Sequence, residues 1–375
     1  MIFNVHGKTL QQQIASVSKV INAKNALSIL DNFLLEVKGD YLYVTGSDQE
    51  TVMTAKMEIT NQENDGKIAI NAKRLMDVVK EVSSFPLSFQ IDNTSGTVDL
   101  RFPGGHFEFM GVNAAEYPES FETDDLSVEM TIPANVIQKG LDYTLFAIST
   151  ETIRPMMTGV YWDFHEDSLT FVGSDTHKLV RYVNRAYQPN RETSFILPGK
   201  PAGILRSLIG KETENIHILK DEKSAIFTFG DFRLGCRFVK GMYPNYNRVI
   251  PQDNPNEMTV DRQTLLSAMR RVSIFASKAS SLVKMTFDSN SLLLQAQDLD
   301  YSTRADEQVQ CSYEGTPMSI GFNSVYMVEV LNNLPGDSIV VKLSDPGRPG
   351  LFMPFEQKED EDVVMLQMPM QVIDV

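Results

Sequence analysis

Ser174, Asp175 and His177 are the residue types of a hydrolytic relay, in which a base activates a hydroxyl nucleophile and an acid orients the base. They lie between two apolar runs, Leu169–Val172 and Leu179–Val183, which are predicted strands. Three side chains packed into one turn cannot align as nucleophile, base and orienter. We therefore interpret Asp175 as a turn residue whose carboxylate accepts hydrogen bonds from its own backbone.

Other sequences that suggest chemistry also lack the required spacing. The stretch 198–201 (Pro-Gly-Lys-Pro) contains the Gly-Lys pair of a phosphate loop, but the spacing is wrong and Pro201 removes an N–H. His165 lacks the second histidine of a zinc-binding helix, so we predict a hairpin loop there. Cys236 and Cys311 stand far apart in apolar surroundings, which favours a reducing cytoplasm over a disulfide framework. We expect no catalytic residue, no metal and no cofactor.

An apolar strand that ends in an aspartate turn recurs along the chain. It occurs at residues 42–48, 169–175 and, in altered form, 292–298, with the aspartates 127 and 123 residues apart. A repeat of this length indicates three copies of a whole domain. We place the domains at residues 1–122, 123–253 and 254–375.

Each copy is predicted to contain two helices among seven or eight short strands. This pattern is typical of an α+β fold in which helices pack on antiparallel sheet. The helices are predicted at residues 8–25, 73–82, 135–148, 200–209, 262–278 and 324–334. Glu119–Asp125 and Pro251–Pro255 are predicted linkers between the copies.

Basic residues are concentrated in these helices. The whole chain has a net charge of −15, yet the six predicted helices hold 13 basic and only four acidic residues. The helix preference of lysine and arginine is one explanation, although glutamate favours helices equally. The other is a shared basic surface that faces the phosphates of duplex DNA without reading sequence. The candidate residues are Lys8, Lys19, Lys24, Lys73, Arg74, Lys200, Arg206, Arg270 and Arg271.

The C-terminal segment Met365–Met370 is apolar and rich in methionine. A buried final strand would explain it. Alternatively, flexible methionine side chains line a groove that accepts varied peptides. No basic segment with an apolar core follows Met1, and no run approaches 18 apolar residues, so we expect neither a signal peptide nor a membrane span.

With these features the whole chain resembles the bacterial sliding clamp family, the β subunits of replicative DNA polymerase III. The motifs that carry the resemblance are residues 173–179 (GSDTHKL), 243–251 (YPNYNRVIP), 321–323 (GFN) and 368–370 (MPM). The resemblance implies a head-to-tail homodimer that closes into a ring, with sheets outside and helices around duplex DNA. It also implies a seam that joins Phe107 and Phe109 of one subunit to Ile274 and Phe275 of the other.

The resemblance further implies a hydrophobic pocket that binds short linear peptides of the replicative polymerase, the clamp loader, other polymerases and repair proteins. The implied pocket residues are Met157, Ser174, Thr176, His177, Lys178, Leu179, Pro244, Arg248, Val249, Leu366, Met368, Pro369 and Met370. The chain departs from the family at Gln371, where an arginine is common, and at Pro155-Met156, where some members place aromatic residues near DNA. Arg154 remains there as a DNA-facing candidate.

The expected function is that of a processivity factor: an accessory subunit that makes and breaks no bond, slides on DNA and tethers the polymerase. Two alternatives stay open from the sequence. One is a peptide-binding adaptor without a DNA role, and the other is an enzyme whose site the motifs do not reveal.

Overall fold

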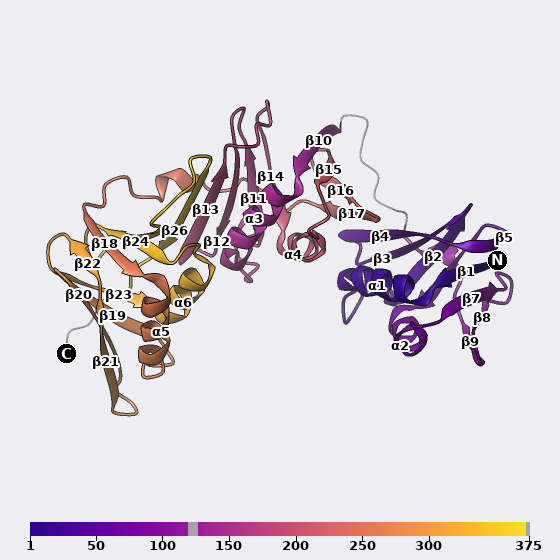
Figure 1. The fold of residues 1–375 in the computed structure, drawn as a ribbon, viewed down its shortest axis with the longest axis horizontal. Coiled ribbons are helices and arrows are strands. Elements are labelled where there is room, and N and C mark those ends of the chain that lie inside the picture. The colour runs from indigo at the N-terminus through magenta and orange to yellow at the C-terminus, as the bar shows by residue number, and fades with distance from the viewer. Residues whose placement is uncertain (119–126, 373–375) are drawn as a thin grey trace. The chain divides into compact units, whose positions relative to one another are not determined.

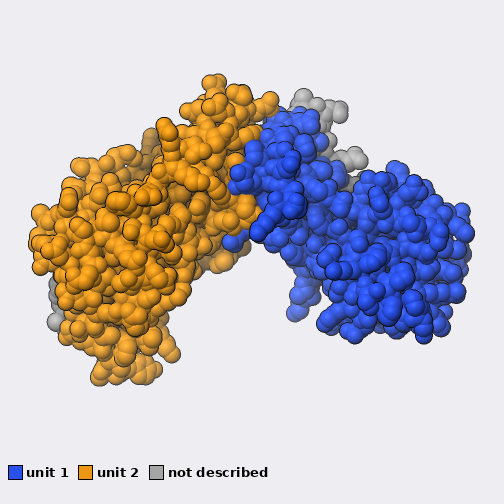
Figure 2. Space-filling view, viewed as in Figure 1, with its two compact units in different colours: residues 1–135, 203–238 blue, residues 136–202, 239–375 orange. Residues whose placement is uncertain are grey.

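The computed structural model describes residues 1–118 and 127–372. The chain divides into two compact units, each of which is considered by itself. Unit 1 consists of residues 1–135 and 203–238, and unit 2 of residues 136–202 and 239–375 (Figure 2). The predicted linker at Glu119–Asp125 lies outside the described residues.

Unit 1 contains two antiparallel sheets. The first, in spatial order, is β5 (Thr60–Glu63), β1 (Ile2–His6), β7 (Pro86–Ile91), β8 (Thr97–Phe102) and β9 (Gly105–Met110). The second is β10 (Val128–Pro133), β15 (Asn215–Lys220), β16 (Ser224–Phe229), β17 (Phe232–Arg237), β4 (Thr51–Glu58), β3 (Tyr41–Ser47), β2 (Asn32–Lys38) and β6 (Gly66–Asn71). The second sheet thus joins strands of the first and second sequence copies through the β17–β4 pair.

Two helices of unit 1, α1 (Gly7–Val17) and α2 (Ala72–Val82), lie side by side in Figure 1 and contact each other. In α1 the buried residues Leu10, Ile14 and Val17 recur every three or four positions, which places them on one face. The Asn71 side chain begins α2 by accepting a hydrogen bond from the N–H of Arg74 at 3.0 Å.

Unit 2 also contains two antiparallel sheets. One runs β14 (Thr193–Pro198), β11 (Gly159–Phe164), β12 (Leu169–Ser174), β13 (Lys178–Asn184), β26 (Glu361–Gln367), β25 (Gly350–Pro354), β24 (Ser338–Leu343), β18 (Asn256–Asp261) and β22 (Ser312–Glu314). The other runs β21 (Thr303–Gln310), β20 (Ser291–Asp298), β19 (Leu282–Asp288) and β23 (Met318–Asn323). The β13–β26 pair makes strands of the second and third copies one continuous sheet.

In unit 2, α5 (Arg262–Ser273) packs against α6 (Ser324–Asn333). The helices α3 (Ala134–Thr144) and α4 (Gly199–Leu208) each have residues in both units. The predicted α+β class, with few helices and antiparallel sheets, is confirmed. The three-domain boundaries predicted above remain a proposal.

Three predicted helices are too long. The helix predicted at residues 135–148 is α3, which ends at Thr144. Instead of residues 8–25, α1 ends at Val17 and a short 3₁₀ turn follows, and α5 ends at Ser273 rather than at residue 278. A serine hydroxyl bonds back to a helix carbonyl at the ends of α1 and α5: Ser18 Oγ donates to the carbonyl of Ala15 at 2.8 Å, and Ser273 Oγ to that of Arg270 at 2.9 Å.

Five strands escaped the sequence prediction: β5, β10, β18, β21 and β22. The longest of them, β21, reads TRADEQVQ and is mostly exposed. Because most of its side chains are exposed, its sequence lacks the apolar alternation by which strands are detected.

Candidate functional site

The turn between β12 and β13 is held by Asp175. Its Oδ1 accepts hydrogen bonds from the backbone N–H groups of His177 and Lys178, both at 2.9 Å. Asp48 and Asp298 accept from the backbone two and three residues onward in the same way. The interpretation of Asp175 as a turn residue is therefore confirmed.

One residue of this turn has an unfavourable backbone conformation. Thr176 has a φ of +81°, in the left-handed region that β-branched residues rarely adopt. Ser174 Oγ accepts from the N–H of Thr176 at 3.2 Å and donates to the carbonyl of Lys178 at 2.9 Å. These hydrogen bonds stabilise the turn although the backbone conformation of Thr176 is unfavourable.

The Lys178 side chain is buried against α6. Its Nζ lies 2.6 Å from Asp175 Oδ2, 3.0 Å from Glu329 Oε2 and 4.5 Å from the centre of the Tyr326 ring. The His177 ring stacks on the same tyrosine at 5.4 Å. Burial alone lowers the pKa of Lys178, but the two carboxylates more than reverse this and leave the pKa raised. Lys178 therefore remains a paired cation that ties the turn to α6.

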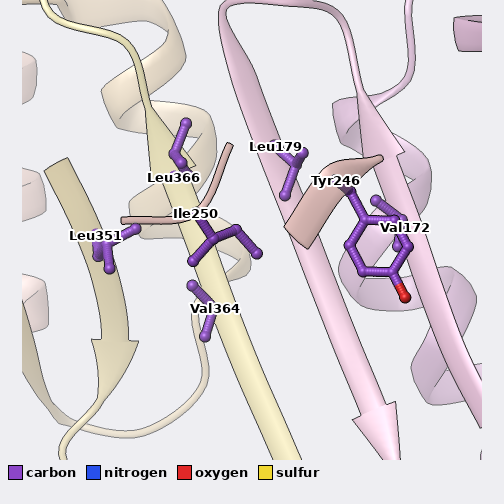
Figure 3. Packing of buried hydrophobic residues seen from close by; sticks show 7 residues of the cluster. All are labelled: Val172, Leu179, Tyr246, Ile250, Leu351, Val364 and Leu366. Atoms are coloured by element: carbon purple, nitrogen blue, oxygen red, sulfur yellow. The ribbon is translucent and has the colours of Figure 1, made fainter. Parts of the chain in front are cut away.

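Beside this turn lies a buried group of apolar side chains, which we name the apolar cluster (Figure 3). Leu179 of β13 pairs with Leu366 of β26, which pairs in turn with Leu351 of β25, so the three leucines form a row across the sheet. Tyr246 and Ile250 come from residues 239–255, which lead into β18, cross these strands and are named here the connecting segment. The full apolar cluster is Val172, Leu179, Tyr246, Ile250, Leu351, Val364 and Leu366.

Tyrosines hold the connecting segment in place. Tyr246 donates from its hydroxyl to Asp163 Oδ2 at 2.8 Å, and burial raises the pKa of Tyr246 far above its usual value. Tyr243 stacks face to face on Tyr161, with ring centres 4.6 Å apart. The hydroxyl of Tyr246 therefore stays protonated and can donate this hydrogen bond. The connecting segment is held in place by these contacts, and its exposed Val249 lies beside Ile250 of the apolar cluster.

The C-terminal tail continues from β26 along the turn. The N–H of Met368 donates to the carbonyl of His177, and that of Met370 to the carbonyl of Gly321, both at 2.8 Å. Met368 is 38% exposed, although Leu366 two residues earlier is buried, and Val249, which precedes Ile250 of the apolar cluster, is 44% exposed. Large apolar groups thus face solvent at the rim of an apolar core, an arrangement typical of a binding surface.

The structure brings most of the predicted pocket residues together around this surface. Leu179 and Leu366 are in the apolar cluster, Ser174 and Lys178 are buried beside it, and the rest are exposed or half-buried on the turn, the connecting segment and the tail. Met157 is half-buried at the end of the 3₁₀ turn 155–157, and its part in the pocket stays a prediction.

Sequence reasoning missed five members of the apolar cluster: Val172, Tyr246, Ile250, Leu351 and Val364. They come from four segments far apart in the chain, and only the packing of the sheet unites them. The continuous apolar run 363–366 predicts a strand buried on both faces, but it does not tell which side chains join the apolar cluster.

The DNA-facing candidates are mostly exposed. Lys8, Lys73, Arg74 and Arg206 project from helices of unit 1, and Arg270 from α5 of unit 2. Lys19 and Lys24 follow α1, Arg154 lies before the 155–157 turn, and Lys200 is half-buried in α4. Arg271 is different, because Glu307 of β21 holds its guanidinium with two hydrogen bonds of 3.0 and 2.5 Å. The charge of Arg271 is thus partly neutralised.

The predicted seam residues lie at two sheet edges or beside them. Among the described strands, β9 pairs with β8 alone and β21 pairs with β20 alone. Ile274 is 77% exposed and Phe275 40% exposed after α5. Phe107 is half-buried and stacks on Phe102 at 5.1 Å, whereas Phe109 is buried within its own unit.

Within residues 1–118 and 127–372, no helix is long and apolar enough to cross a membrane. The same residues contain no group of three or more His, Cys, Asp or Glu side chains placed to hold a metal ion.

Three family models match the chain in succession. They describe the N-terminal, central and C-terminal domains of the DNA polymerase III beta subunit and match residues 1–121, 131–245 and 247–371. The chain belongs to the DNA polymerase III beta subunit family. Its function is accordingly that of a processivity factor of DNA polymerase III.

Curated relatives match over their full length. The beta sliding clamp of Pseudomonas aeruginosa is 26% identical, and that of Bacillus subtilis 25% identical; each match covers 99% of this chain and 100% of the relative. A crystal structure of the sliding clamp from Bartonella birtlesii bound to griselimycin is 27% identical, with a TM-score of 0.92 over 99% of this chain and 100% of that one. The fold of three tandem clamp domains is thus shared with the family.

Proposed function

We propose that two copies of the chain close head to tail into a ring around duplex DNA, and that the candidate site tethers the polymerase to this ring. The observation that carries the tethering is the apolar cluster with exposed Met368 and Val249 at its rim. Nothing in this role requires the chain to make or break a bond. A cytoplasmic location belongs to the same proposal.

The candidate site suits short linear peptides. Few anchoring side chains supply most of the affinity at such sites, and apolar ones gain it by leaving water. Methionines at the rim adapt their shape to different residues, so one site serves the replicative polymerase, the clamp loader, other polymerases and repair proteins in turn. The griselimycin bound to the clamp of Bartonella birtlesii supports a ligand site on this fold.

The unpaired strand edges support the ring. An exposed edge strand invites pairing with another chain, and a head-to-tail dimer that closes would cover both β9 and β21 at each seam. Exposed Ile274 and Phe275, with half-buried Phe107, would supply the apolar contact. The division into domains at residues 1–122, 123–253 and 254–375 would then give six similar domains around the DNA.

The first prediction concerns primer extension on a long, singly primed circular template with the replicative polymerase and clamp loader. Adding this protein should lengthen the products at least about tenfold, because tethering raises effective affinity by 10²–10⁴. Met368→Asp should return the lengths to those obtained without the protein, since Met368 is exposed at the candidate site. Unchanged lengths on addition of the wild type would instead favour a peptide-binding adaptor without a role on DNA.

The second prediction concerns Arg270, whose Nη2 donates to Asn332 at 2.7 Å and is not engaged by a carboxylate in the described ion pairs. Each phosphate contact contributes about −0.9 to the slope of log affinity against log salt concentration. Arg270→Ala, present twice per ring, should make this slope less negative by about 2 in anisotropy titrations with a 30-base-pair duplex.

The matched control is Arg348→Ala, which removes an exposed arginine paired with Asp345 on a loop of the same unit. Its salt dependence should equal that of the wild type. An unchanged slope for Arg270→Ala would mean that helix propensity, and not DNA contact, explains the basic residues of α5.

A further inference from the structure

The tail passes close to the edge of β23 at Gly321. The carbonyl of Gly321 accepts from the N–H of Met370 at 2.8 Å, and the two residues form an isolated antiparallel bridge. A Cβ at Gly321 would lie 2.7 Å from the carbonyl oxygen of Met370, 2.7 Å from Leu282 Cδ1 and 2.9 Å from Val372 Cγ2. Glycine is needed here for space, because any side chain would collide with the tail.

The next residue, Phe322, is fully buried. Its ring meets that of Phe352 edge to face, with centres 6.0 Å apart. Phe352 pairs with Met365 of β26 and is adjacent to Leu351 of the apolar cluster. Phe322 therefore fixes β25, and through it the strand from which the tail departs.

Asn323 forms a hydrogen bond with Gln367, the last residue of β26. Its carbonyl accepts from Gln367 Nε2 at 2.8 Å, and Gln367 is fully buried. The Asn323 side chain meanwhile accepts from the N–H groups of Val325 and Tyr326, and so begins α6. One residue thus joins the start of α6 to the start of the tail.

We infer that Gly321–Asn323, which we name the tail anchor, positions Met368–Met370 for ligand binding at the candidate site. The inference rests on the proposed peptide site and adds the residues that pre-organise its tail wall. The tail is held at Gln367 before the Met368–Met370 segment and at Met370 where the segment ends. A segment fixed at both ends loses less conformational freedom when a ligand binds, which raises affinity without a new contact.

Val372 also contacts the tail anchor. Its Cγ2 lies over Gly321, beyond the Met-Pro-Met motif, at the described end of the chain. Val372 therefore contributes to holding the motif. This gives Val372 a positioning role in a chain that has Gln371 where an arginine is common in the family.

The test is Gly321→Ala, with Gly210→Ala as the matched control because a Cβ at Gly210 meets no atom within 4 Å. Griselimycin serves as the probe, and its dissociation constant is measured by titration calorimetry. We expect Gly321→Ala to weaken binding about tenfold, the scale of a lost pre-organised contact, and Gly210→Ala to leave it unchanged. Equal affinity for both variants would overturn the tail anchor.

A second readout keeps the test independent of folding and of the proposed site. With ¹³C-methyl-labelled methionine, Gly321→Ala should shift the resonance of Met370 but not those of Met258 and Met269, which are buried elsewhere in unit 2. Val372→Gly, which lies after the last strand, should weaken binding about threefold with the melting temperature unchanged.

The outcomes separate the two hypotheses. If the wild type fails to bind griselimycin, the proposed peptide site is wrong for this probe, and the Met370 resonance alone decides the tail anchor. If the wild type binds griselimycin but neither the Met370 resonance nor the affinity changes in Gly321→Ala, the proposed role of the tail anchor is wrong and the proposed peptide site stands.

Discussion

Deletion of Met368–Val375 should abolish binding at the candidate site, with a loss of at least about a hundredfold in affinity. The deletion removes the exposed Met368 at the rim of the apolar cluster. It also removes the backbone bonds from Met368 and Met370, and leaves the carbonyls of His177 and Gly321 to water. Loss of one central anchoring residue costs 2 kcal/mol or more at such sites, and about 2.7 kcal/mol corresponds to the expected hundredfold.

The same deletion should leave the dimer intact, because the proposed seam residues lie on β9 and after α5. Calorimetric titration with griselimycin measures the affinity, and light scattering after gel filtration measures the mass. The control is a deletion of residues 373–375 alone, which retains Met368, Met370 and Val372 and should bind as the wild type does. Undiminished affinity after the longer deletion would place the ligand site elsewhere.

The repeated aspartate turn illustrates what sequence reasoning could find. Asp48, Asp175 and Asp298 were recognised from their neighbours alone, and all three accept hydrogen bonds from the backbone just ahead of them. Local chemistry determines such a turn, because donor and acceptor lie within three residues. The α+β class followed from the same local patterns.

Features that depend on distant residues were harder to predict. Lys178 could be named as a pocket residue, but its burial between Asp175 and Glu329 depends on α6, about 150 residues away. The apolar cluster forms only because β13 pairs with β26, and no local sequence pattern predicts this pairing. Likewise, Phe109 is predicted from the sequence to contact the other subunit, whereas in the structure it is buried within its own unit.

The predictions of helix ends and of edge strands were wrong for a related reason. A serine hydroxyl bonds back to a helix carbonyl where α1 and α5 end, although the apolar spacing continues beyond them. In β21 the sequence is polar because most of its side chains are exposed, and among the described strands it is held only by its hydrogen bonds to β20. Both errors occur where hydrogen bonding, and not apolar periodicity, determines the structure.

The second large effect concerns how the ring stays on DNA. A ring that slides must bind the duplex weakly, so its retention depends on closure and not on contacts. On the proposed role, the basic residues would contribute only a salt-sensitive attraction, and the chain as a whole has a net charge of −15. Loss of closure should therefore shorten retention far more than loss of any one arginine.

A seam variant provides the matched control for closure. Ile274 is 77% exposed, so Ile274→Asp should not disturb folding of the protomer. It would place a charge in the apolar contact proposed for the seam and open the ring. The variant should fail to remain on circular DNA after loading, while it keeps its affinity for griselimycin.

The most direct measurement is retention on a loaded circular plasmid before and after one restriction cut, followed by gel filtration. We predict that the wild type elutes with the closed circle and is lost from the linear form within minutes, because it slides off the ends. Equal retention on circular and linear DNA would contradict encirclement.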